Sequence, residues 1–328
     1  MEILKTGGNL MARAKILITG DIPEAGLQEL RQNFDVFDNA AVTDRSWVLR
    51  HLHEFDGMIL SGTKGDRELL DAGTNLKIIS TKGDGFDNVD IDYAKQKGIV
   101  VAHCSRSVRY STAETALGLI LATARRFHFY DHAIREGKWL DVSNPKYMGM
   151  NLAGETLGIY GYGGIGGQVA KFCQVLGMKV LYNKRHRLPA EEEKQRKIEY
   201  ADFATLVKEA DILSLHAPAT PETAGVFNKA VFKQMKKTAL LVNVARGSLV
   251  KEDDLVWALE TGEIAGAGLD VYEHEPKVTA ALRKLDNVVL LPHVGTGTTA
   301  ARVAMAKEAS QNLISYLRDG VAINQVNK

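Results

Sequence analysis

Short apolar runs alternate with longer mixed segments along the chain, and this pattern predicts strands alternating with helices. Mixed segments in the front third predict helices, the first beginning near Pro23, a residue suited to a first turn. Such alternation indicates a parallel sheet covered by helices on both faces. The apolar runs of this part predict strands at Lys15–Gly20, Gly57–Ser61, Leu76–Ser80 and Gly98–Ala102.

A second alternating series follows the irregular stretch from Asn144 to Ala153. Several short strands with helices between them match a doubly wound sheet. The apolar runs predict strands at Thr156–Tyr160, Lys179–Tyr182, Asp211–Leu215, Ala239–Asn243, Ala265–Asp270 and Asn287–Leu291.

Two long helical patterns frame this second series. The first runs from Ser111 to about Glu136 and is long enough to bridge two domains, and the second is Thr299–Leu317, which we expect to return to the first domain. We therefore predict an α/β fold of two Rossmann-like or flavodoxin-like doubly wound domains, with the active site in the cleft between them. The predicted divisions are 11–111 plus 292–328 for a discontinuous substrate-binding domain, 112–291 for a dinucleotide-binding domain, and 1–10 for an extension or tag.

Composition narrows the function classes. A chain of 328 residues favours two domains, and its net charge of +1 supplies no field for gathering nucleic acid or an anionic membrane. The two cysteines, Cys104 and Cys173, lie in apolar contexts, so we expect neither a disulfide framework nor a metal site, and a reducing cytosol fits best. No apolar run approaches a membrane span, and residues 1–10 lack the features of a signal peptide. We expect a cytoplasmic protein.

A glycine-rich loop directly follows the strand that ends at Tyr160. The glycines of G-x-G-x-x-G allow a tight turn, close approach of a pyrophosphate and close packing of helix on strand, and the next helix offers unpaired N–H groups to the phosphates. A lone motif of this kind also occurs in ordinary turns, but here the strand, the helix and a second strand agree with the dinucleotide interpretation. The loop consists of Gly161, Tyr162, Gly163, Gly164, Ile165 and Gly166.

The end of the next strand bears on the choice of cofactor. NAD-binding versions carry an acidic residue there for the adenosine ribose, but this chain has Asn183, and the first nearby acid is Glu191. The cations that follow Asn183 either form a solvated surface run or bind a 2′-phosphate, and the missing acid favours the second interpretation. We expect NADP to be preferred and NAD to remain usable, with Arg185 and either Lys184 or Arg187 at the phosphate.

The other strand ends hold candidates for the reacting groups, because ligands of such sheets bind at the carboxyl ends of the strands. Reduction of a 2-oxo acid needs a proton donor, a cation that polarises the carbonyl, and donors for the carboxylate. Arg246 offers a bidentate fork, His293 a proton, and Glu275 a carboxylate that raises the pKa of the imidazole. Each residue alone has an ordinary structural explanation, so the prediction depends on all of them together. Other strand-end residues include His216, Ala217 and Pro218.

From about Lys15 onward the chain resembles the D-isomer-specific 2-hydroxyacid dehydrogenase family. The resemblance implies Arg246, Glu275 and His293 as the catalytic residues. It also implies a substrate site of Asp84, Gly85, Arg246 and His293, in which the backbone N–H groups of Asp84 and Gly85 hold the carboxylate. It further implies that the cofactor site includes Thr223, Val244, Ala245, Arg246, Asp270, His293 and Gly295. The matching segments are Gly83–Asp90, Ala113–Leu117, Gly161–Gly166, Val242–Val250, Gly268–Pro276 and Leu291–Gly295.

The cationic segment is similar to that of NADPH-preferring glyoxylate/hydroxypyruvate reductases, which implies reduction of a small 2-oxo acid to the D-2-hydroxy acid. Glyoxylate, hydroxypyruvate, pyruvate and bulkier oxo acids all stay open as substrates. Asp84 replaces the family's small apolar residue and would repel the substrate unless it turns away or pairs with Lys82. Thr296 occupies a position where family members frequently have Ser or Ala, so the choice among similar substrates stays open.

Family members dimerise through the arm from Ala113 to Leu152, so we expect a homodimer. Two alternatives to a glyoxylate-type reductase remain. One is an NAD-linked D-lactate-type dehydrogenase of bulkier oxo acids, which the missing acid disfavours. The other is a dinucleotide-sensing binding protein on the same fold, for which the chain shows no added interaction domain or basic tract.

Overall fold

The computed structural model describes residues 13–38 and 44–328, and this part of the chain divides into two compact units. The first unit combines the residues up to Ser107 with Thr299–Lys328, and the second is Val108–Thr298. The chain thus changes unit after Ser107 and again after Thr298, a few residues from the predicted divisions at 111 and 292. The predicted extension, 1–10, lies outside the described residues.

The first unit is built on a sheet of five parallel strands in the order β2-β1-β3-β4-β5. This is the flavodoxin-like order of a doubly wound fold. The strands are β1 (Lys15–Ile18), β2 (Asp35–Phe37), β3 (Gly57–Leu60), β4 (Ile78–Thr81) and β5 (Val100–Ala102). The helices are α1 (Gln28–Asn33), α2 (Arg45–His51), α3 (Arg67–Ala72), α4 (Ile91–Gln96) and α12 (Thr299–Asp319), with short 3₁₀ turns at Glu24–Gly26 and Leu52–Glu54.

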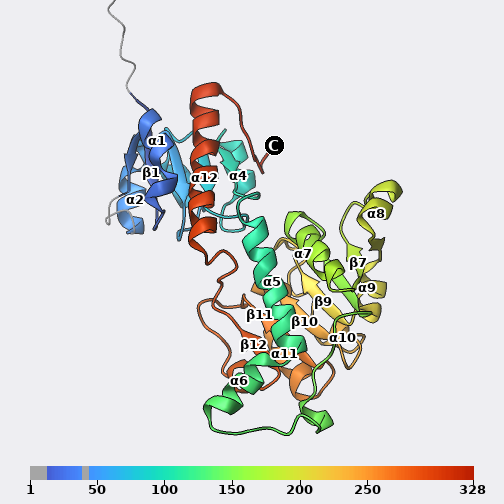
Figure 1. Ribbon diagram of the computed structural model, residues 1–328. Coiled ribbons are helices and arrows are strands. Elements are labelled where there is room, and N and C mark those ends of the chain that lie inside the picture. The colour runs from blue at the N-terminus through green and yellow to red at the C-terminus, as the bar shows by residue number, and fades with distance from the viewer. Residues whose placement is uncertain (1–12, 39–43) are drawn as a thin grey trace, which may run out of the picture. The chain divides into compact units, whose positions relative to one another are not determined.

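Helix α12 packs against the sheet of this first unit (Figure 1). Its buried residues Leu313 and Ile314 share a core cluster with Ile16 and Ile18 of β1. Contact with the turn before α1 is so close that a Cβ on Gly26 would lie 2.2 Å from that of Ala306. The C-terminal helix thus belongs to the first unit.

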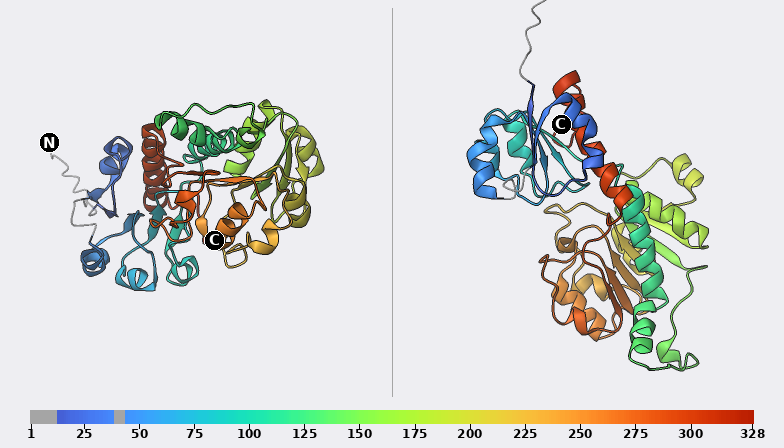
Figure 2. Two further views of the ribbon diagram at one scale, coloured as in Figure 1. Left: turned by 90° about the horizontal axis from the view of Figure 1, so that it is seen from below. Right: turned by 60° about the vertical axis from the view of Figure 1, so that its left-hand side comes forward.

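The second unit is built on seven parallel strands in the order β12-β11-β10-β9-β6-β7-β8. Figure 2 shows helices on both faces of this sheet, as in a Rossmann-type fold. The strands are β6 (Thr156–Tyr160), β7 (Lys179–Asn183), β8 (Glu199–Tyr200), β9 (Ile212–Leu215), β10 (Leu240–Asn243), β11 (Gly266–Leu269) and β12 (Val288–Leu290). The helices are α5 (Arg109–Ala124), α6 (Phe127–Arg135), α7 (Gly164–Val175), α8 (Ala190–Arg196), α9 (Phe203–Glu209), α10 (Lys229–Phe232) and α11 (Glu252–Glu260). Single 3₁₀ turns lie at Pro145–Tyr147, Gly247–Leu249 and Leu282–Lys284.

Strand register brings the ends of five central strands to one edge. Tyr160 at the end of β6 lies opposite Asn183 of β7 and Leu215 of β9. Leu215 in turn lies opposite Asn243 of β10, which lies opposite Leu269 of β11. Loops that leave these strands therefore start side by side, and they carry most of the predicted site residues of this unit.

The sequence pattern missed two edge strands. Strand β2 has an exposed–intermediate–exposed pattern, and β8 is only two residues long. Neither contains an apolar run, because an edge strand outside the central core needs none. The helix expected near Pro23 is a 3₁₀ turn at Glu24–Gly26 followed by α1 at Gln28–Asn33.

The long helix predicted from Ser111 to Glu136 was wrong in one respect, since it is two helices. Helix α5 ends at Ala124, and α6 begins at Phe127 after Arg126, whose φ is 54°. The carbonyl of Ala124 accepts a hydrogen bond from the N–H of Met150 at 2.9 Å. A loop distant in sequence thus takes the acceptor at the point where the helix ends.

Both cysteines are buried and unpaired. Among the described residues, no helix is long and apolar enough to cross a membrane. Within the same residues, no cluster of three or more His, Cys, Asp or Glu side chains is arranged to hold a metal ion.

Candidate functional site

The glycine loop after β6 folds tightly against the start of the segment after β9. Gly161 has φ of +97°, and a Cβ on it would lie 2.4 Å from the backbone nitrogen of Ala217. A Cβ on Gly166 would lie 2.7 Å from the carbonyl oxygen of Gly161. Only glycine fits these two positions, which is what the dinucleotide interpretation of the loop requires.

Helix α7 begins directly after this turn, with Gly163 as its N-cap and no side-chain hydrogen bond to cap it. A Cβ on Gly163 would meet nothing within 4 Å, so space is open beside the helix N-terminus. Uncapped N–H groups and the positive end of the helix dipole suit a phosphate group. The residues present therefore fit the pyrophosphate of a dinucleotide. The side chain of Tyr162, in contrast, is buried behind the loop, with its ring centre 4.9 Å from that of Tyr182.

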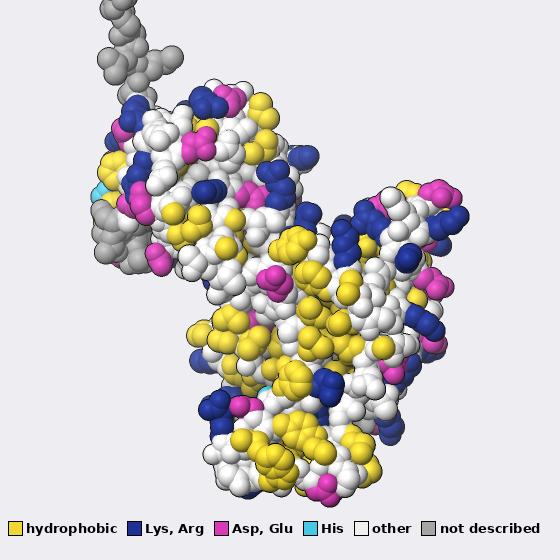
Figure 3. All heavy atoms as spheres, in the orientation of Figure 1, with side chains coloured by type: hydrophobic (Ala, Val, Ile, Leu, Met, Phe, Trp, Pro, Cys, Tyr) yellow, Lys and Arg dark blue, Asp and Glu magenta, His cyan; other side chains and the backbone are white. Residues whose placement is uncertain are grey.

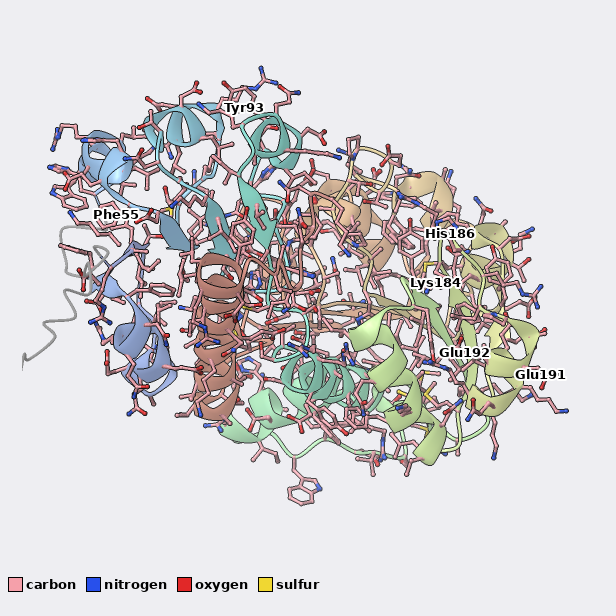
Figure 4. All side chains as sticks on the ribbon, turned by 90° about the horizontal axis from the view of Figure 1, so that it is seen from above. Phe55, Tyr93, Lys184, His186, Glu191 and Glu192 are labelled. Carbon is pink, nitrogen blue, oxygen red and sulfur yellow. The ribbon has the colours of Figure 1, made fainter. Side chains whose placement is uncertain are left out.

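The predicted 2′-phosphate residues follow β7. The amide of Asn183 donates to the carbonyl of Ala201 at 2.8 Å, Lys184 is half-buried, and Arg185 is exposed. Figure 4 shows Lys184 and His186 in the segment after β7, and Glu191 and Glu192 on helix α8. No carboxylate occupies the end of β7 itself.

Arg187 differs from its neighbours because Glu193 already binds it. Its Nε and Nη2 donate to the two carboxylate oxygens of Glu193, each at 2.8 Å, and its guanidinium lies over the ring of Tyr200. Hydrogen bonds from Arg187 and Tyr182 lower the pKa of Glu193 to about 2, so this pair is fully charged near neutral pH. Because Glu193 already binds the guanidinium of Arg187, the structure favours Lys184 over Arg187 as the companion of Arg185, and this choice stays a prediction.

The segment after β9 forms a second wall near the glycine loop. Its His216 accepts or donates one hydrogen bond with the hydroxyl of Ser214, at 2.8 Å from Nε2. Burial lowers the pKa of His216 to about 3, so the imidazole is neutral. Thr223 closes its own turn, because its hydroxyl donates to the carbonyl of Pro218 at 2.8 Å and accepts from the N–H of Thr220 at 2.8 Å.

His293 and Glu275 form a hydrogen-bonded pair. Nδ1 of His293 lies 2.8 Å from Oε2 of Glu275, whose Oε1 accepts from the N–H of Tyr272 at 3.0 Å. The Glu275 hydrogen bond raises the pKa of His293 against the opposing effect of burial. Burial alone would raise the pKa of Glu275, but the bonds from His293 and Tyr272 lower it below its usual value. The pairing that the sequence suggested is thus present, with Nδ1 occupied.

Arg246 lies close enough for its charge to act on both members of this pair. It helps to lower the pKa of Glu275 and opposes the rise in the pKa of His293. Its backbone is positioned by the buried amide of Asn243, which donates to the Arg246 carbonyl at 2.9 Å and accepts from the N–H of Ala245 at 3.0 Å. Nη1 of Arg246 donates to the carbonyl of Ala245 at 2.7 Å. The three predicted reacting groups therefore occupy one neighbourhood within the second unit.

Asp270 holds the turn that carries His293. Asp270 is only 1% exposed, and its carboxylate accepts hydrogen bonds from the N–H groups of Val294 at 2.7 Å and Gly295 at 2.8 Å. Its backbone carbonyl accepts a third bond, from the N–H of His293 at 2.8 Å. Burial raises its pKa, and these backbone bonds oppose the rise. The hydroxyl of Ser111 adds a bond to the Gly295 carbonyl at 2.8 Å, a contact that sequence reasoning missed. Val244 is buried at the end of β10.

Asp84 and Gly85 belong to the first unit, in the loop after β4. The carbonyl of Asp84 lies 2.9 Å from Nδ1 of His103, and its Oδ1 lies 3.4 Å from the same nitrogen. Lys82, which the sequence offered as a partner for Asp84, donates instead to the carbonyl of Asp21. The sequence left open whether Asp84 turns away or pairs with Lys82, and in the structure its carboxylate lies beside His103.

The sequence pattern did not reveal the structural role of Glu193, which binds both Tyr182 and Arg187. It stands last in a run of three glutamates at the start of α8, and such a run reads as a solvent-exposed first turn. In the structure its side chain is buried and joins α8 to β7 through Tyr182, whose hydroxyl donates to it at 2.6 Å. A buried tyrosine at a strand end, which needs a partner, is the one signal that would have pointed to it.

Taken together, a Rossmann-type unit with a phosphate-binding loop and an imidazole–carboxylate pair beside an arginine defines a nicotinamide-dependent oxidoreductase. The comparisons agree with this class. The profile described as "D-isomer specific 2-hydroxyacid dehydrogenase, NAD binding domain" matches residues 117–295. The chain therefore belongs to the D-isomer-specific 2-hydroxyacid dehydrogenase family, and the prediction of an NAD(P)-dependent 2-hydroxyacid dehydrogenase is confirmed.

Similar proteins cover nearly the whole chain. A glyoxylate reductase of Thermococcus litoralis is 40% identical over 323 residues, which are 96% of this chain and 97% of that protein. The crystal structure of a glyoxylate reductase from Paecilomyes thermophila superposes with a TM-score of 0.88 at 32% identity, covering 96% and 99% of the two chains. An NADPH-dependent glyoxylate/hydroxypyruvate reductase from Sinorhizobium meliloti, in complex with NADP and malonate, gives 0.84 at 32% identity over 96% and 97%. These similarities also confirm the predicted fold of two parallel-sheet α/β domains.

Proposed function

We propose that this protein reduces small 2-oxo acids of the glyoxylate and hydroxypyruvate type to D-2-hydroxy acids, with NADPH preferred as the hydride source. The observation that carries the proposal is the His293–Glu275 hydrogen bond of 2.8 Å, with the charge of Arg246 acting on both residues. A protonated imidazole beside a guanidinium suits a carbonyl whose oxygen must gain a proton as it is reduced. When bound, the reduced nicotinamide supplies the hydride.

His293 is the proton donor in this proposal. Ionised Glu275 accepts the hydrogen bond of Nδ1, so Nε2 carries the proton that can be transferred to the substrate oxygen. Because Glu275 raises the pKa of His293, the imidazolium persists to a higher pH than an isolated histidine would allow. Asp270 keeps the ring in place by holding the backbone on both sides of it.

Arg246 polarises the substrate carbonyl and anchors the carboxylate with its fork of N–H donors. The predicted contribution of the backbone N–H groups of Asp84 and Gly85, in the first unit, to carboxylate binding stays a prediction. Asp84 is next to His103, so its negative charge is offset whenever that imidazole is protonated. The predicted roles of the two units, substrate-binding for the first and dinucleotide-binding for the second, are part of this proposal. The predicted cleft between them stays a prediction.

The cofactor site uses the residues that line the strand ends of the second unit. Gly161 to Gly166 hold the pyrophosphate, while the segment from His216 to Thr223, with Val244, Ala245 and Gly295, lies along the rest of the dinucleotide. Lys184 and Arg185 bind the 2′-phosphate, and the absence of a carboxylate at the end of β7 removes what would repel it. The similar Sinorhizobium meliloti enzyme, described as NADPH-dependent, supports the preference.

We also propose a homodimer formed through the arm that includes α6 and the segment after it. Trp139 is 91% exposed, and Phe127, Ile134, Val142 and Met148 are each more than half exposed. Figure 3 shows apolar side chains gathered over α5, α6 and this arm. Exposed apolar side chains gathered in this way favour burial against a second copy. Light scattering of the purified protein measures the mass, and a monomer at micromolar concentration would contradict the proposal.

The test of function is a panel of 2-oxo acids assayed with NADPH and with NADH by absorbance. We expect the highest kcat/KM for glyoxylate or hydroxypyruvate with NADPH, and a D-configured product where the product is chiral. Highest activity with NADH and bulkier oxo acids would favour a D-lactate-type dehydrogenase. Tight cofactor binding without turnover of any acid would favour a dinucleotide sensor.

A further inference from the structure

An arginine at the start of helix α5 lies against the phosphate-binding loop. Arg109 is the first residue of α5, and a Cβ on Gly164 would lie 2.4 Å from its Nε and 2.9 Å from its Cζ and Nη2. Gly164 is the first residue of α7, so the guanidinium occupies the space beside the helix N-terminus that a side chain at 164 would take. Nearby, the Tyr110 and Phe172 rings lie 6.0 Å apart and hold the start of α5 against α7.

Among the described residues, Arg109 has no hydrogen-bonding or ion-pairing partner that explains this position. Its Nε is buried, and no described residue accepts a hydrogen bond from it. Nor does any described carboxylate form an ion pair with its guanidinium. An arginine with partly buried N–H groups ordinarily has a partner in the protein. Arg187, which is paired with Glu193, follows this rule, and Arg109 does not.

The location of Arg109 is electrostatically unfavourable without a ligand. The N-terminus of a helix carries a partial positive charge, and α7 spans 12 residues with no side-chain cap. A cation placed there is repelled, and a buried donor without a partner adds a desolvation cost. Both costs disappear when an anion binds between the helix end and the guanidinium.

We propose that Arg109 is a cofactor-binding residue whose guanidinium donates to the pyrophosphate of the dinucleotide at the N-terminus of α7. Because Arg109 contacts Gly164 of the glycine loop, we assign it to the pyrophosphate and not to the 2′-phosphate, whose candidate residues follow β7. The planar fork of arginine suits two phosphate oxygens, and it supplements the backbone N–H groups of the glycine loop. The inference rests on the proposed dinucleotide function and adds a residue that neither the motif nor the family resemblance identified.

The test measures dissociation constants rather than turnover, by titrating NADPH and NADH fluorescence with wild type and Arg109→Met. Methionine keeps most of the length and removes the charge and the donors. We expect Arg109→Met to weaken both dinucleotides by the same factor, about 10- to 100-fold, the range of a charge-assisted hydrogen bond. Arg109→Lys keeps the charge but not the fork and should show a smaller loss.

Arg125→Met is the matched control. Arg125 is exposed at the C-cap of the same helix, so the substitution removes an equal charge at the other end of α5. We expect its dissociation constants to equal those of wild type. If the control weakens binding as much as Arg109→Met, the effect comes from net charge and the proposal is overturned.

Thermal unfolding without ligand separates binding from folding. Because Arg109 is repelled by the helix end, Arg109→Met should unfold at or above the wild-type Tm, and NADPH should raise its Tm less than it raises that of wild type. A lowered Tm without ligand together with unchanged dissociation constants would show a packing role and overturn the proposal. If Arg109→Met does not fold, Arg109→Lys supplies the same two measurements.

Failure of this inference can be told apart from failure of the proposed function. Wild type that binds neither NADPH nor NADH would overturn both. Wild type that binds them as tightly as Arg109→Met does would overturn only the role of Arg109. A loss confined to NADPH would place Arg109 at the 2′-phosphate and equally contradict the proposal.

Discussion

The two ends of the candidate site are built differently. At the reacting end, His293 is held by Glu275 through its ring and by Asp270 through its backbone, and buried Asn243 positions the backbone of Arg246. At the end where we propose that the adenosine binds, Arg185 is exposed and Lys184 is half-buried, and the described residues form no comparable network around them. The reacting end must keep geometry and protonation constant, whereas the adenosine end must only attract a charged group. Chemistry should therefore be easy to destroy and cofactor preference easy to change.

The largest effect should follow loss of the cation at the reacting end. We expect Arg246→Ala to lower kcat/KM about 10⁴-fold, because one lost transition-state donor costs about 10²–10³-fold and the substrate carboxylate loses its fork as well. Steady-state kinetics with the preferred oxo acid measures this. The dissociation constant of NADPH should change little, and near-normal kcat/KM would refute the role of Arg246.

Loss of the proton donor should come next. We expect His293→Ala to lower kcat for reduction about 10³-fold, within the range of general acid catalysis. Binding of NADPH, measured by fluorescence, should stay close to wild type. A variant that no longer binds NADPH would mean that His293 supports the cofactor rather than the reaction.

The pH profile tests the coupling between His293 and Glu275. Glu275 raises the pKa of His293, so kcat/KM for reduction should fall as the pH rises through that raised value and the donor loses its proton. Glu275→Gln removes the stabilising charge, so the pKa of His293 falls and the descending limb moves to lower pH. Activity at pH 7 should fall about 10- to 100-fold. An unmoved limb would assign the titration to another group.

Cofactor preference should respond to a double substitution at the adenosine end. Asn183→Asp together with Arg185→Ala restores an acid for the ribose and removes a cation from the 2′-phosphate. We expect the ratio of kcat/KM for NADPH to that for NADH to fall about 10- to 100-fold, with maximal kcat nearly unchanged. An unchanged ratio would show that the 2′-phosphate contacts lie elsewhere.

The smallest effect on the cofactor should come from Arg187, although it stands only two residues from Arg185. We expect Arg187→Ala to change the dissociation constant of NADPH less than about threefold, because Glu193 already binds this guanidinium. Its unfolding temperature should fall, since the buried carboxylate of Glu193 loses its cation. A loss of NADPH affinity equal to that of Arg185→Ala would reverse our assignment.

Local pattern was sufficient for most of the architecture. Buried strands such as β6 and β9 are continuous apolar runs, and the glycine loop could be placed because strand, turn and helix follow one another within a few residues. Strands β2 and β8 could not be found this way, since edge strands need no apolar run. The end of α5 could not be found this way either. There the carbonyl of Ala124 accepts a hydrogen bond from the N–H of Met150, which lies 26 positions later in the sequence.

Amino-acid order alone determined the fold class and singled out the glycine loop, Arg246, Glu275 and His293 as candidates, because each lies in a local motif or follows the end of a predicted strand. Only the tertiary structure decided which charged groups are available for a ligand. Arg187 and Arg109 both lie beside the cofactor motifs. The guanidinium of Arg187 forms an ion pair with Glu193, whereas that of Arg109 lies against Gly164 at the start of α7. Electrostatic pairing acts through space over a few ångströms, and folding sets those distances between residues far apart along the chain.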